Sequence, residues 1–574
     1  MDRRTLLALA LTAIVIVATP LLFPTTRPQR ANVVGSTADS RAGVAVPATG
    51  SQPTPTVSAA PQRPVTAPGR ATTAPKNARL RAESTTVSTN RATYRLVSPG
   101  GVPGAVTLPA YRSLRPGVTK GTPVDLVEEG DRLFRLTIQS GAEMLDLDTV
   151  SFRFEPPTRD GSAIVQRLTS VSLARALTLT YRFPADSFIM TVEGVRAGAS
   201  GASGDTRLFV SLPAGLHSEE ADVPDDVRHL AFAYRVGNGE AESVTFRDLD
   251  TLVRADSGVL RWVAERNKYF MVAALPAGRD TAFRVMLMRG EPRVNGEALH
   301  ARATAMLPLA GNSFTFRVFA GPQSWDHLRV TAAELENVNP YGGWLHGVVQ
   351  PFATIVMRLL LWMRDTVNVG YGWVLVIFGV VVRLLMWPLN QNAMRSSMKL
   401  QRIQPQLTEL QARHKNDPEK QREAMMKLYQ EHGMSPFTPI LGCLPMMLPM
   451  PILFALYFVF QNTIELRGVS FLWLPDLSLR DPYFITPLFM GVSMFVLSWI
   501  GMRGMPPNPQ SKMMLYIMPV MFTVLFWNFA SGLNLYYAVQ NVAALPQQWL
   551  LAHERTSKTN GAKKLGGPKG SPSG

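Results

Sequence analysis

The most unusual charged residue in this chain is an arginine inside a hydrophobic segment. Residues 371–388 are almost wholly apolar apart from Arg383, and a run of this length and composition predicts a membrane-spanning helix. An arginine near the centre of such a helix costs about 2.5–3.5 kcal/mol on insertion scales. Two explanations stay open. Arg383 can snorkel to the nearer interface with its long side chain, or it can lie in a hydrated cavity where the charge has a role.

Polar side chains in the later hydrophobic segments favour the hydrated cavity. Polar residues inside membrane spans usually face the bundle interior or a water-filled space. The amides and hydroxyls that could line such a cavity together with Arg383 are Gln461, Asn528, Asn534, Tyr536, Tyr537 and Gln540. No acidic residue lies inside the predicted spans. The counterpart of Arg383 would therefore be water, or an acid brought by a substrate.

A proline-rich stretch at 436–451 opens the hydrophobic segment 437–463. Prolines at this density forbid a regular helix, and broken backbone at membrane depth must face protein or water, not lipid. Met446, Met447 and Met450 would supply a soft apolar surface that adapts to varied partners, or would simply fill gaps between helices.

The composition excludes several classes of function. The single cysteine, Cys443, cannot form a disulfide within one chain, and no Cys/His cluster has zinc spacing. There is no P-loop, Gly-rich dinucleotide loop or Gly-x-Ser-x-Gly motif. We therefore expect no metal, no cofactor and no enzymatic activity. The net charge of +16 suggests basic cytoplasmic loops and contact with anionic membrane lipid, not a DNA-binding groove; ribosomal RNA stays possible for an exposed basic tail.

The first part of the chain divides into an anchor, a tether and a domain. Residues 1–23 have a basic start and an uncharged apolar run without a good cleavage site, which predicts an uncleaved signal-anchor helix. Residues 24–90 are rich in Pro, Ala, Thr and Ser, and we interpret them as a disordered tether. Short alternating segments separated by Gly, Pro and Asp predict a large β-sandwich over 91–340, with helical periodicity only near 323–338.

The acidic residues of this domain do not predict catalysis. Glu219, Glu220, Asp225 and Asp226 lie close together in the sequence. We interpret them as a solvated turn and not as a catalytic carboxylate pair.

The second part of the chain predicts a helical membrane domain over 367–552. Residues 341–366 are interrupted by Arg358 and Arg364 and suit an amphipathic helix at the interface. The later segments predict further membrane-spanning helices, at about 371–388, 437–463, 483–502, 513–528 and 533–552.

The distribution of charged residues between the loops predicts the orientation of the spans in the membrane. The loop 389–436 has eight basic and five acidic residues, the tail 553–574 is basic, and the loop 464–482 has two basic against three acidic residues. This asymmetry predicts six spans in total, with both termini in the cytoplasm and the β domain outside.

The loop 389–436 is itself predicted to be a helical hairpin. Its first arm has an apolar stripe formed by Leu400, Ile403, Leu407 and Leu410. Asp417 and Pro418 have the types expected at the N-cap and first turn of the second arm. A loop of this length with its own apolar stripe is more than a connector needs, which favours a docking role.

These segments resemble the YidC-type membrane protein insertases, in their Gram-negative six-span form. The resemblance covers the layout of the whole chain and is most specific over 341–552. It rests on several motifs in the same order, including Val382-Arg383 with Pro388-Leu389, Gly442-Cys443-Leu444-Pro445, Asp481-Pro482-Tyr483, Ser531-Gly532-Leu533 and Leu535-Tyr536-Tyr537.

The resemblance implies a bacterial inner-membrane protein that inserts and folds nascent membrane proteins, alone or with the Sec translocon. It implies a hydrophilic groove with Arg383 as the groove arginine and Tyr537 as a residue that contacts substrate. The hairpin 389–436 and the basic tail would contact the ribosome or a targeting factor. The periplasmic domain would be a galactose-mutarotase-like super-sandwich without obvious catalysis.

The chain departs from the family pattern at several positions. Some relatives have Thr where Gly379 stands, one helical turn before Arg383, so the groove contact of that hydroxyl is missing here. Pro449 and Ala530 also differ from many relatives. Two other classes stay as alternatives: a secondary transporter, which would usually show internal repeats, and an envelope assembly factor that works through its β domain.

Overall fold

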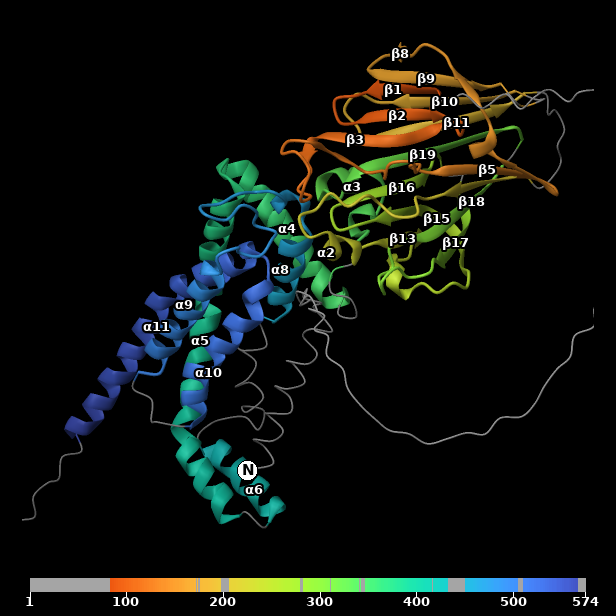
Figure 1. Cartoon of the computed structure of the whole chain (residues 1–574). Coiled ribbons are helices and arrows are strands. Elements are labelled where there is room, and N and C mark those ends of the chain that lie inside the picture. Colours follow the sequence, from red (N-terminus) through yellow and green to blue (C-terminus); the bar gives the residue numbers. More distant parts are fainter. Residues whose placement is uncertain are drawn as a thin grey trace, which may run out of the picture. The chain divides into compact units, whose positions relative to one another are not determined.

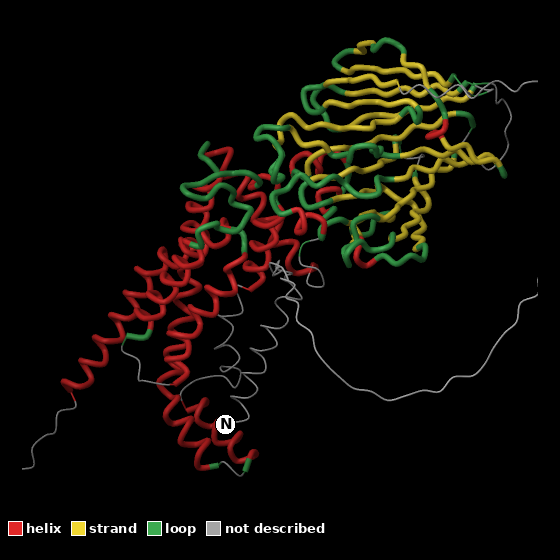
Figure 2. Tube along the Cα trace, viewed as in Figure 1, coloured by secondary structure: helices red, strands yellow, loops and turns green. Residues whose placement is uncertain are grey.

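The computed structural model describes residues 83–565, except 172, 174–175, 198–205, 279–281, 310, 340, 342–345, 415–416, 432–449 and 504–508 (Figure 1). The predicted anchor 1–23, the tether up to residue 82, the positions of Met446 and Met447 and the end of the basic tail lie outside the described residues. Within the described residues, strands make up the first part of the chain and helices the second (Figure 2).

The β domain consists of antiparallel strands that form two sheets. The smaller sheet has four strands in the order β1-β2-β3-β4, and the larger has 15 strands. Their bounds are β1 Glu83–Ser88, β2 Thr93–Ser98, β3 Val102–Arg112, β4 Pro123–Asp125, β5 Arg135–Ser140, β6 Glu143–Asp146, β7 Phe152–Phe154, β8 Thr158–Asp160, β9 Ala163–Ser170, β10 Leu177–Phe183, β11 Ile189–Arg196, β12 Thr206–Ser211, β13 Ala231–Val236, β14 Ala241–Thr245, β15 Arg254–Arg266, β16 Phe270–Pro276, β17 Phe283–Gly290, β18 Ala301–Pro308 and β19 Ser313–Pro322.

The two sheets share one hydrophobic core, as expected for sheets whose strands alternate buried and exposed side chains. The rings of Tyr94 in β2 and Phe183 in β10 lie 4.7 Å apart. The hydroxyl of Tyr181 donates to the backbone carbonyl of Gly101 at 2.7 Å. A side chain at Gly101 would meet Phe152 at 2.9 Å, and the backbone there has φ +67°. The turn between β2 and β3 therefore requires glycine, because the second sheet approaches it so closely.

The predicted all-β domain is confirmed, but its start and some strands differ from the prediction. Strand β1 begins at Glu83, so residues 83–90 belong to the folded domain and not to the tether. Strand β15 was not predicted, because its C-terminal half is buried throughout and shows no alternation. The predicted helical segment near 323–338 contains helix α3 (Trp325–Thr331) and a 3-10 turn at Leu335–Asn337.

The second part of the described chain is helical. A short helix α2 (Val223–Val227) lies within the β domain. The longer helices are α4 His346–Val367, α5 Tyr371–Arg413, α6 Pro418–Glu431, α8 Met450–Asn462, α9 Ile485–Gly501, α10 Pro509–Leu525 and α11 Ser531–Leu565. Figure 1 shows α5, α9, α10 and α11 running beside one another, and α6 next to the C-terminal half of α5.

One helical segment in the described part of the chain, Tyr371–Pro388, is long and apolar enough to cross a membrane. Three shorter apolar helices span Leu453–Asn462, Ile485–Gly501 and Leu515–Asn528. They overlap the predicted spans 437–463, 483–502 and 513–528, and α11 covers 533–552. The number of spans stays a prediction.

Helix α5 does not end where the apolar segment ends. The sequence predicted that Pro388 closes the span and that a separate hairpin arm follows, whereas the helix continues through Pro388 and Pro405 to Arg413. Proline removes one backbone donor, and membrane helices tolerate this where neighbouring groups compensate. The membrane segment and the first arm of the hairpin are therefore one helix of 43 residues.

The C-terminal half of α5 and helix α6 are the described part of the predicted hairpin 389–436. The side-chain carboxylate of Asp417 accepts a hydrogen bond from the backbone N–H of Lys420 at 3.2 Å, as an N-cap does. This contact holds the pKa of Asp417 below its usual range. Ile403 in the first arm and Leu428 and Tyr429 in the second are buried.

The acidic residues predicted to form a solvated turn are buried instead. Glu219, Glu220 and Asp226 are almost inaccessible to solvent. Asp225 forms an ion pair with Lys268 at 2.9 Å, and Glu220 forms one with Arg467 at 2.7 Å. These basic partners lie 43 and 247 residues away in the sequence, which is why a local pattern did not reveal them.

Candidate functional site

The guanidinium of Arg383 lies between helices α5 and α11. Its Nη2 donates to the side-chain oxygen of Gln547 at 2.9 Å, and Nε2 of Gln547 donates to the carbonyl of Trp387 at 3.0 Å. Gln547 is fully buried. The amide therefore connects α11 to both a side chain and the backbone of α5, which fixes the arginine within the bundle.

The partner of Arg383 is neutral. In the described part of the chain, no acidic side chain forms an ion pair with Arg383, and its Nε is buried without a hydrogen-bond partner. A guanidinium carries five N–H donors in a planar fork that suits carboxylates. The site therefore presents a positive charge with unused donors, which is the property that recognition of an acidic group requires.

Gly379 sets the spacing of α5 and α11 one turn before Arg383. A Cβ atom at this position would lie 3.1 Å from Cγ1 of Val539 and 3.6 Å from Cδ2 of Tyr536. The rings of Phe378 and Tyr536 pack at 5.5 Å. The position where some relatives have Thr therefore faces α11, and glycine allows the two helices to approach closely.

Tyr536, Gln540 and Gln547 share one face of α11. Their spacings of four and eleven residues are close to one and three helical turns. Tyr536 is buried, and its hydroxyl accepts a hydrogen bond from Nε2 of Gln540 at 2.6 Å. We call the set Arg383, Gln547, Gln540 and Tyr536 the polar seam. Two of the predicted groove residues thus join Arg383 along the same helix pair.

Tyr537 lies on a neighbouring face of α11. Its ring packs edge-on against Phe526 at 5.5 Å and is only half-buried. It also packs edge-on against the ring of Tyr536 at 5.3 Å, so Tyr537 contacts the polar seam through this neighbour.

Three predicted groove residues lie elsewhere. Asn534 is fully buried, and its amide donates to the carbonyl of Phe526 at 3.1 Å. Asn528 is exposed and accepts a 3.5 Å hydrogen bond from Arg480. The backbone carbonyl of Gln461 accepts from the hydroxyl of Tyr269 in the β domain at 3.2 Å. Asn528 and Gln461 thus contact a loop and the β domain, not Arg383.

The methionine surface was predicted from Met446, Met447 and Met450. Met446 and Met447 lie outside the described residues. Met450 begins α8, and its side chain is outside the description too.

Sequence reasoning missed Gln547, although a helical projection of α11 could have found it. It also missed how Asn541 is used: its amide donates to the hydroxyl of Ser493 in α9 at 3.1 Å. The polar residues of α11 therefore serve two helix contacts, one with α5 and one with α9.

The sequence is similar to two family models that together cover most of the described chain. Residues 84–355 match a model described as the YidC periplasmic domain. Residues 362–559 match a model described as the 60Kd inner membrane protein.

Several similar proteins are described as membrane protein insertase YidC. That of Chlorobium phaeovibrioides is 32% identical over 67% of this chain and 67% of its own length. The protein of Burkholderia multivorans is 30% identical over 73% of this chain and 71% of its own length. The protein of Cupriavidus necator is 28% identical over 92% of this chain and 91% of its own length. A crystal structure described as an active YidC insertase with its first transmembrane domain resolved covers 82% of this chain and 94% of its own, at 18% identity and a TM-score of 0.33. From the matching models and relatives we conclude that this chain belongs to the YidC family of membrane protein insertases, with a periplasmic β domain and an inner-membrane helical domain.

Proposed function

We propose that this chain inserts and folds inner-membrane proteins through a hydrophilic groove that is open to the cytoplasm and includes the polar seam. The single observation that carries the proposal is the partner of Arg383, which is the neutral amide of Gln547 and not an acid. An acidic partner within the chain would have neutralised the positive charge of Arg383. An arginine with a neutral partner and unused donors can instead meet an acidic group of an incoming chain.

The physical basis of the step is the cost of moving polar groups through hydrocarbon. A hydrophilic segment that crosses a dry bilayer loses its hydrogen bonds to water. A hydrated half-groove with one positive charge shortens the dry path and attracts acidic residues of the segment. The apolar helix of the substrate then partitions into lipid and drives the step, so neither nucleotide nor catalysis is needed. Tyr537, Asn528, Asn534 and Gln461 remain candidates for substrate contact.

We propose the six-span topology with both termini in the cytoplasm and the β domain in the periplasm. The charge asymmetry between the loops 389–436 and 464–482 supports this orientation. In this topology α4 lies at the periplasmic membrane surface, and the hairpin of α5 and α6 projects into the cytoplasm.

We also propose that the hairpin docks the ribosome or a targeting factor, and that the protein works alone or with the Sec translocon. A cavity of about 400 Å³ lies between the two arms of the hairpin. Its charged lining residues are Glu409, Arg413, Lys427 and Glu431. This mixed polar lining is typical of a docking surface and not of a buried connector.

The test is complementation in cells depleted of their own insertase. Full-length chains with Arg383→Ala, Arg383→Gln or Arg383→Lys would be compared for insertion of a small single-span substrate with an acidic tail. We expect Ala and Gln to lose most insertion and Lys to retain part of it. Arg503→Ala is the matched control, because Arg503 stacks on Trp499 at 4.0 Å and is not part of the polar seam.

Two other functions predict different results. An envelope assembly factor that works through its β domain would insert the substrate normally with Arg383→Ala but fail when most of 91–337 is deleted. A secondary transporter would show saturable small-solute uptake in liposomes. Normal insertion by Arg383→Ala would overturn the groove mechanism.

A further inference from the structure

A polar pocket lies where α4 ends and α5 begins. Its volume is about 540 Å³, which is within the range of small-ligand sites. The residues that line it include Arg364, Asp365, Asn368, Gly370, Tyr371 and Val469. The polar seam contributes none of these lining residues.

Two opposite charges stand side by side in this pocket and are only weakly paired. Nη1 of Arg364 lies 3.8 Å from Oδ1 of Asp365, and the side chains are 54% and 70% exposed. Each charge is therefore free to contact a ligand. The guanidinium of Arg364 also lies over the ring of Tyr371, 5.1 Å from its centroid, which restricts the side chain to the pocket.

Tyr371 places a buried polar atom among the residues that line the pocket. Only 9% of this residue is exposed, yet its hydroxyl is buried without a hydrogen-bond partner. A buried hydroxyl without a partner is costly, so such groups usually mark an interaction with water or a ligand. Gly370, the N-cap of α5, provides no side-chain cap, so the first backbone amides of this long helix also favour an anion.

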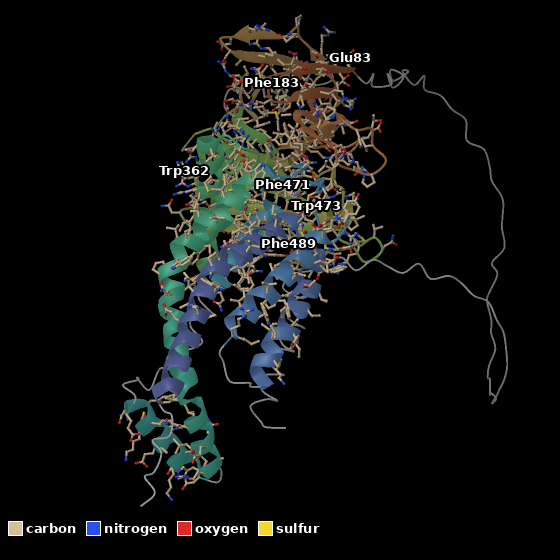
Figure 3. All side chains as sticks on the ribbon, turned by 90° about the vertical axis from the view of Figure 1, so that its left-hand side faces the viewer. Glu83, Phe183, Trp362, Phe471, Trp473 and Phe489 are labelled. Carbon is tan, nitrogen blue, oxygen red and sulfur yellow. The ribbon has the colours of Figure 1, made fainter. Side chains whose placement is uncertain are left out.

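In the proposed topology, on which this inference rests, the pocket lies at the level of the membrane surface. Tyr371 is the first residue of the apolar segment Tyr371–Pro388. Trp362, Trp373 and Trp473 are all exposed, and exposed indoles gather at membrane–water interfaces. Trp362 and Trp473 come from different elements and lie at a similar height in Figure 3. A lipid at this level would place its polar headgroup in the pocket and its acyl chains towards the apolar segment that Tyr371 begins.

We propose that the pocket binds the headgroup of a zwitterionic phospholipid that carries a primary amine. The phosphodiester contacts Arg364 and the first amides of α5, and the ammonium contacts Asp365. Free phosphate offers the same anionic chemistry, but it satisfies neither Asp365 nor the exposed indoles. Binding would hold the end of α4 at the membrane surface and fix the point where α5 enters the bilayer.

Native mass spectrometry of the full-length chain in detergent tests the proposal. The protein would be titrated with dilauroyl phosphatidylethanolamine or with dilauroyl phosphatidylglycerol, which lacks the amine, and sodium phosphate would be added as a competitor. We expect Arg364→Gln to weaken phosphatidylethanolamine binding by about tenfold, the size of one charge-assisted contact. Asp365→Asn should weaken phosphatidylethanolamine binding and leave phosphatidylglycerol binding unchanged.

The matched control is Arg358→Gln, which removes the same charge from α4 but faces Trp325 and not the pocket. Arg364→Lys keeps the charge and should retain most binding, so a folding defect in Arg364→Gln alone cannot mimic the result. Equal lipid binding by Arg364→Gln and Arg358→Gln would overturn the proposal. Displacement of the lipid by millimolar phosphate would show that the pocket binds phosphate and not a lipid headgroup. If Asp365→Asn keeps the preference for phosphatidylethanolamine over phosphatidylglycerol, Asp365 does not bind the amine.

Discussion

Nε of Arg467 lies 2.7 Å from one oxygen and 3.0 Å from the other oxygen of Glu220, and the two side chains are only 4% and 7% exposed. Arg467 also donates to the backbone carbonyls of Arg112 and Glu219 and lies 5.3 Å from the ring centroid of Phe270. One side chain from the loop after α8 thus reaches the core of the β domain.

Removing this arginine should loosen the contact between the β domain and the helices. At pH 8, where Glu220 is ionised, Arg467→Met leaves its carboxylate buried without the charged partner, and breaking a buried ion pair in this way costs about 3–5 kcal/mol. Thermal unfolding of the full-length chain in detergent measures the effect. The control is Arg480→Met, which changes an exposed arginine in the same loop. The double variant Arg467→Met/Glu220→Gln should recover part of the loss; if it is no more stable than Arg467→Met, the pair is not the cause.

Stability should depend on pH through Glu220. Burial raises the pKa of Glu220 from its usual 4.5 to about 7, although Arg467 opposes this shift. Between these two pH values the folded state binds a proton that the unfolded state lacks. This contribution to stability is complete below about pH 4.5 and is lost as pH rises towards 7, with a slope of at most about 1.4 kcal/mol per pH unit.

The measurement compares wild type with Glu220→Gln across pH 4.5–8. Burial lowers the pKa of His229 to about 4, so the contribution of His229 to stability increases with pH in part of the same range. This contribution is the same in wild type and in Glu220→Gln. The stability difference between them should therefore isolate Glu220. Parallel curves would show that Glu220 does not titrate in this range.

Substitution of Gln547 should reduce insertion as much as substitution of Arg383 does, but for a different reason. Gln547→Glu places an anion 2.9 Å from the guanidinium, which should stabilise the fold and consume the charge that a substrate would meet. We expect slower insertion together with a higher melting temperature. Gln548→Glu is the control, because Gln548 packs against Gly501 of α9. Undiminished insertion by Gln547→Glu would contradict a role for the free charge.

Gly379→Thr should separate α5 from α11. The added Cβ would lie 3.1 Å from Val539, and overpacking of this kind costs about 1–3 kcal/mol. Gly379→Ala adds only the Cβ and should cost less. In thermal unfolding, Val539→Ala should restore much of the stability of Gly379→Thr. Additive losses in the double variant would show that the two side chains do not compete for this space.

Helices and strands were predicted from the sequence more accurately than the side chains that contact one another. Alternation predicted the all-β domain, including β10 and its neighbour β11, and Asp417-Pro418 located the start of α6 to the residue. By contrast, Glu220 was misinterpreted because Arg467 lies 247 residues away. Gln547 was missed because the helix that carries its partner is 164 residues earlier. Periodicity reports which face of an element is buried, whereas the identity of the facing side chain depends on the tertiary arrangement.

The candidate site shows the same limit at finer scale. Arg383, Tyr536 and Gln540 were predicted together and lie along one helix pair. Asn528 and Gln461 were grouped with them because they are polar and lie in apolar segments, but both lie at the end of a helix. Depth along a span, which sequence composition does not report, separates the two groups.

The unbroken helix α5 connects the hairpin directly to the site of Arg383. Its 43 residues extend about 65 Å at 1.5 Å per residue, from the pocket at Tyr371 past Arg383 to the end of the first hairpin arm. Because α5 is one helix, a partner that turns the hairpin about the axis of α5 would strain the hydrogen bond between Arg383 and Gln547, which holds the guanidinium within the bundle. In the proposed topology, a cytoplasmic partner bound to the hairpin would act on Arg383 in this way.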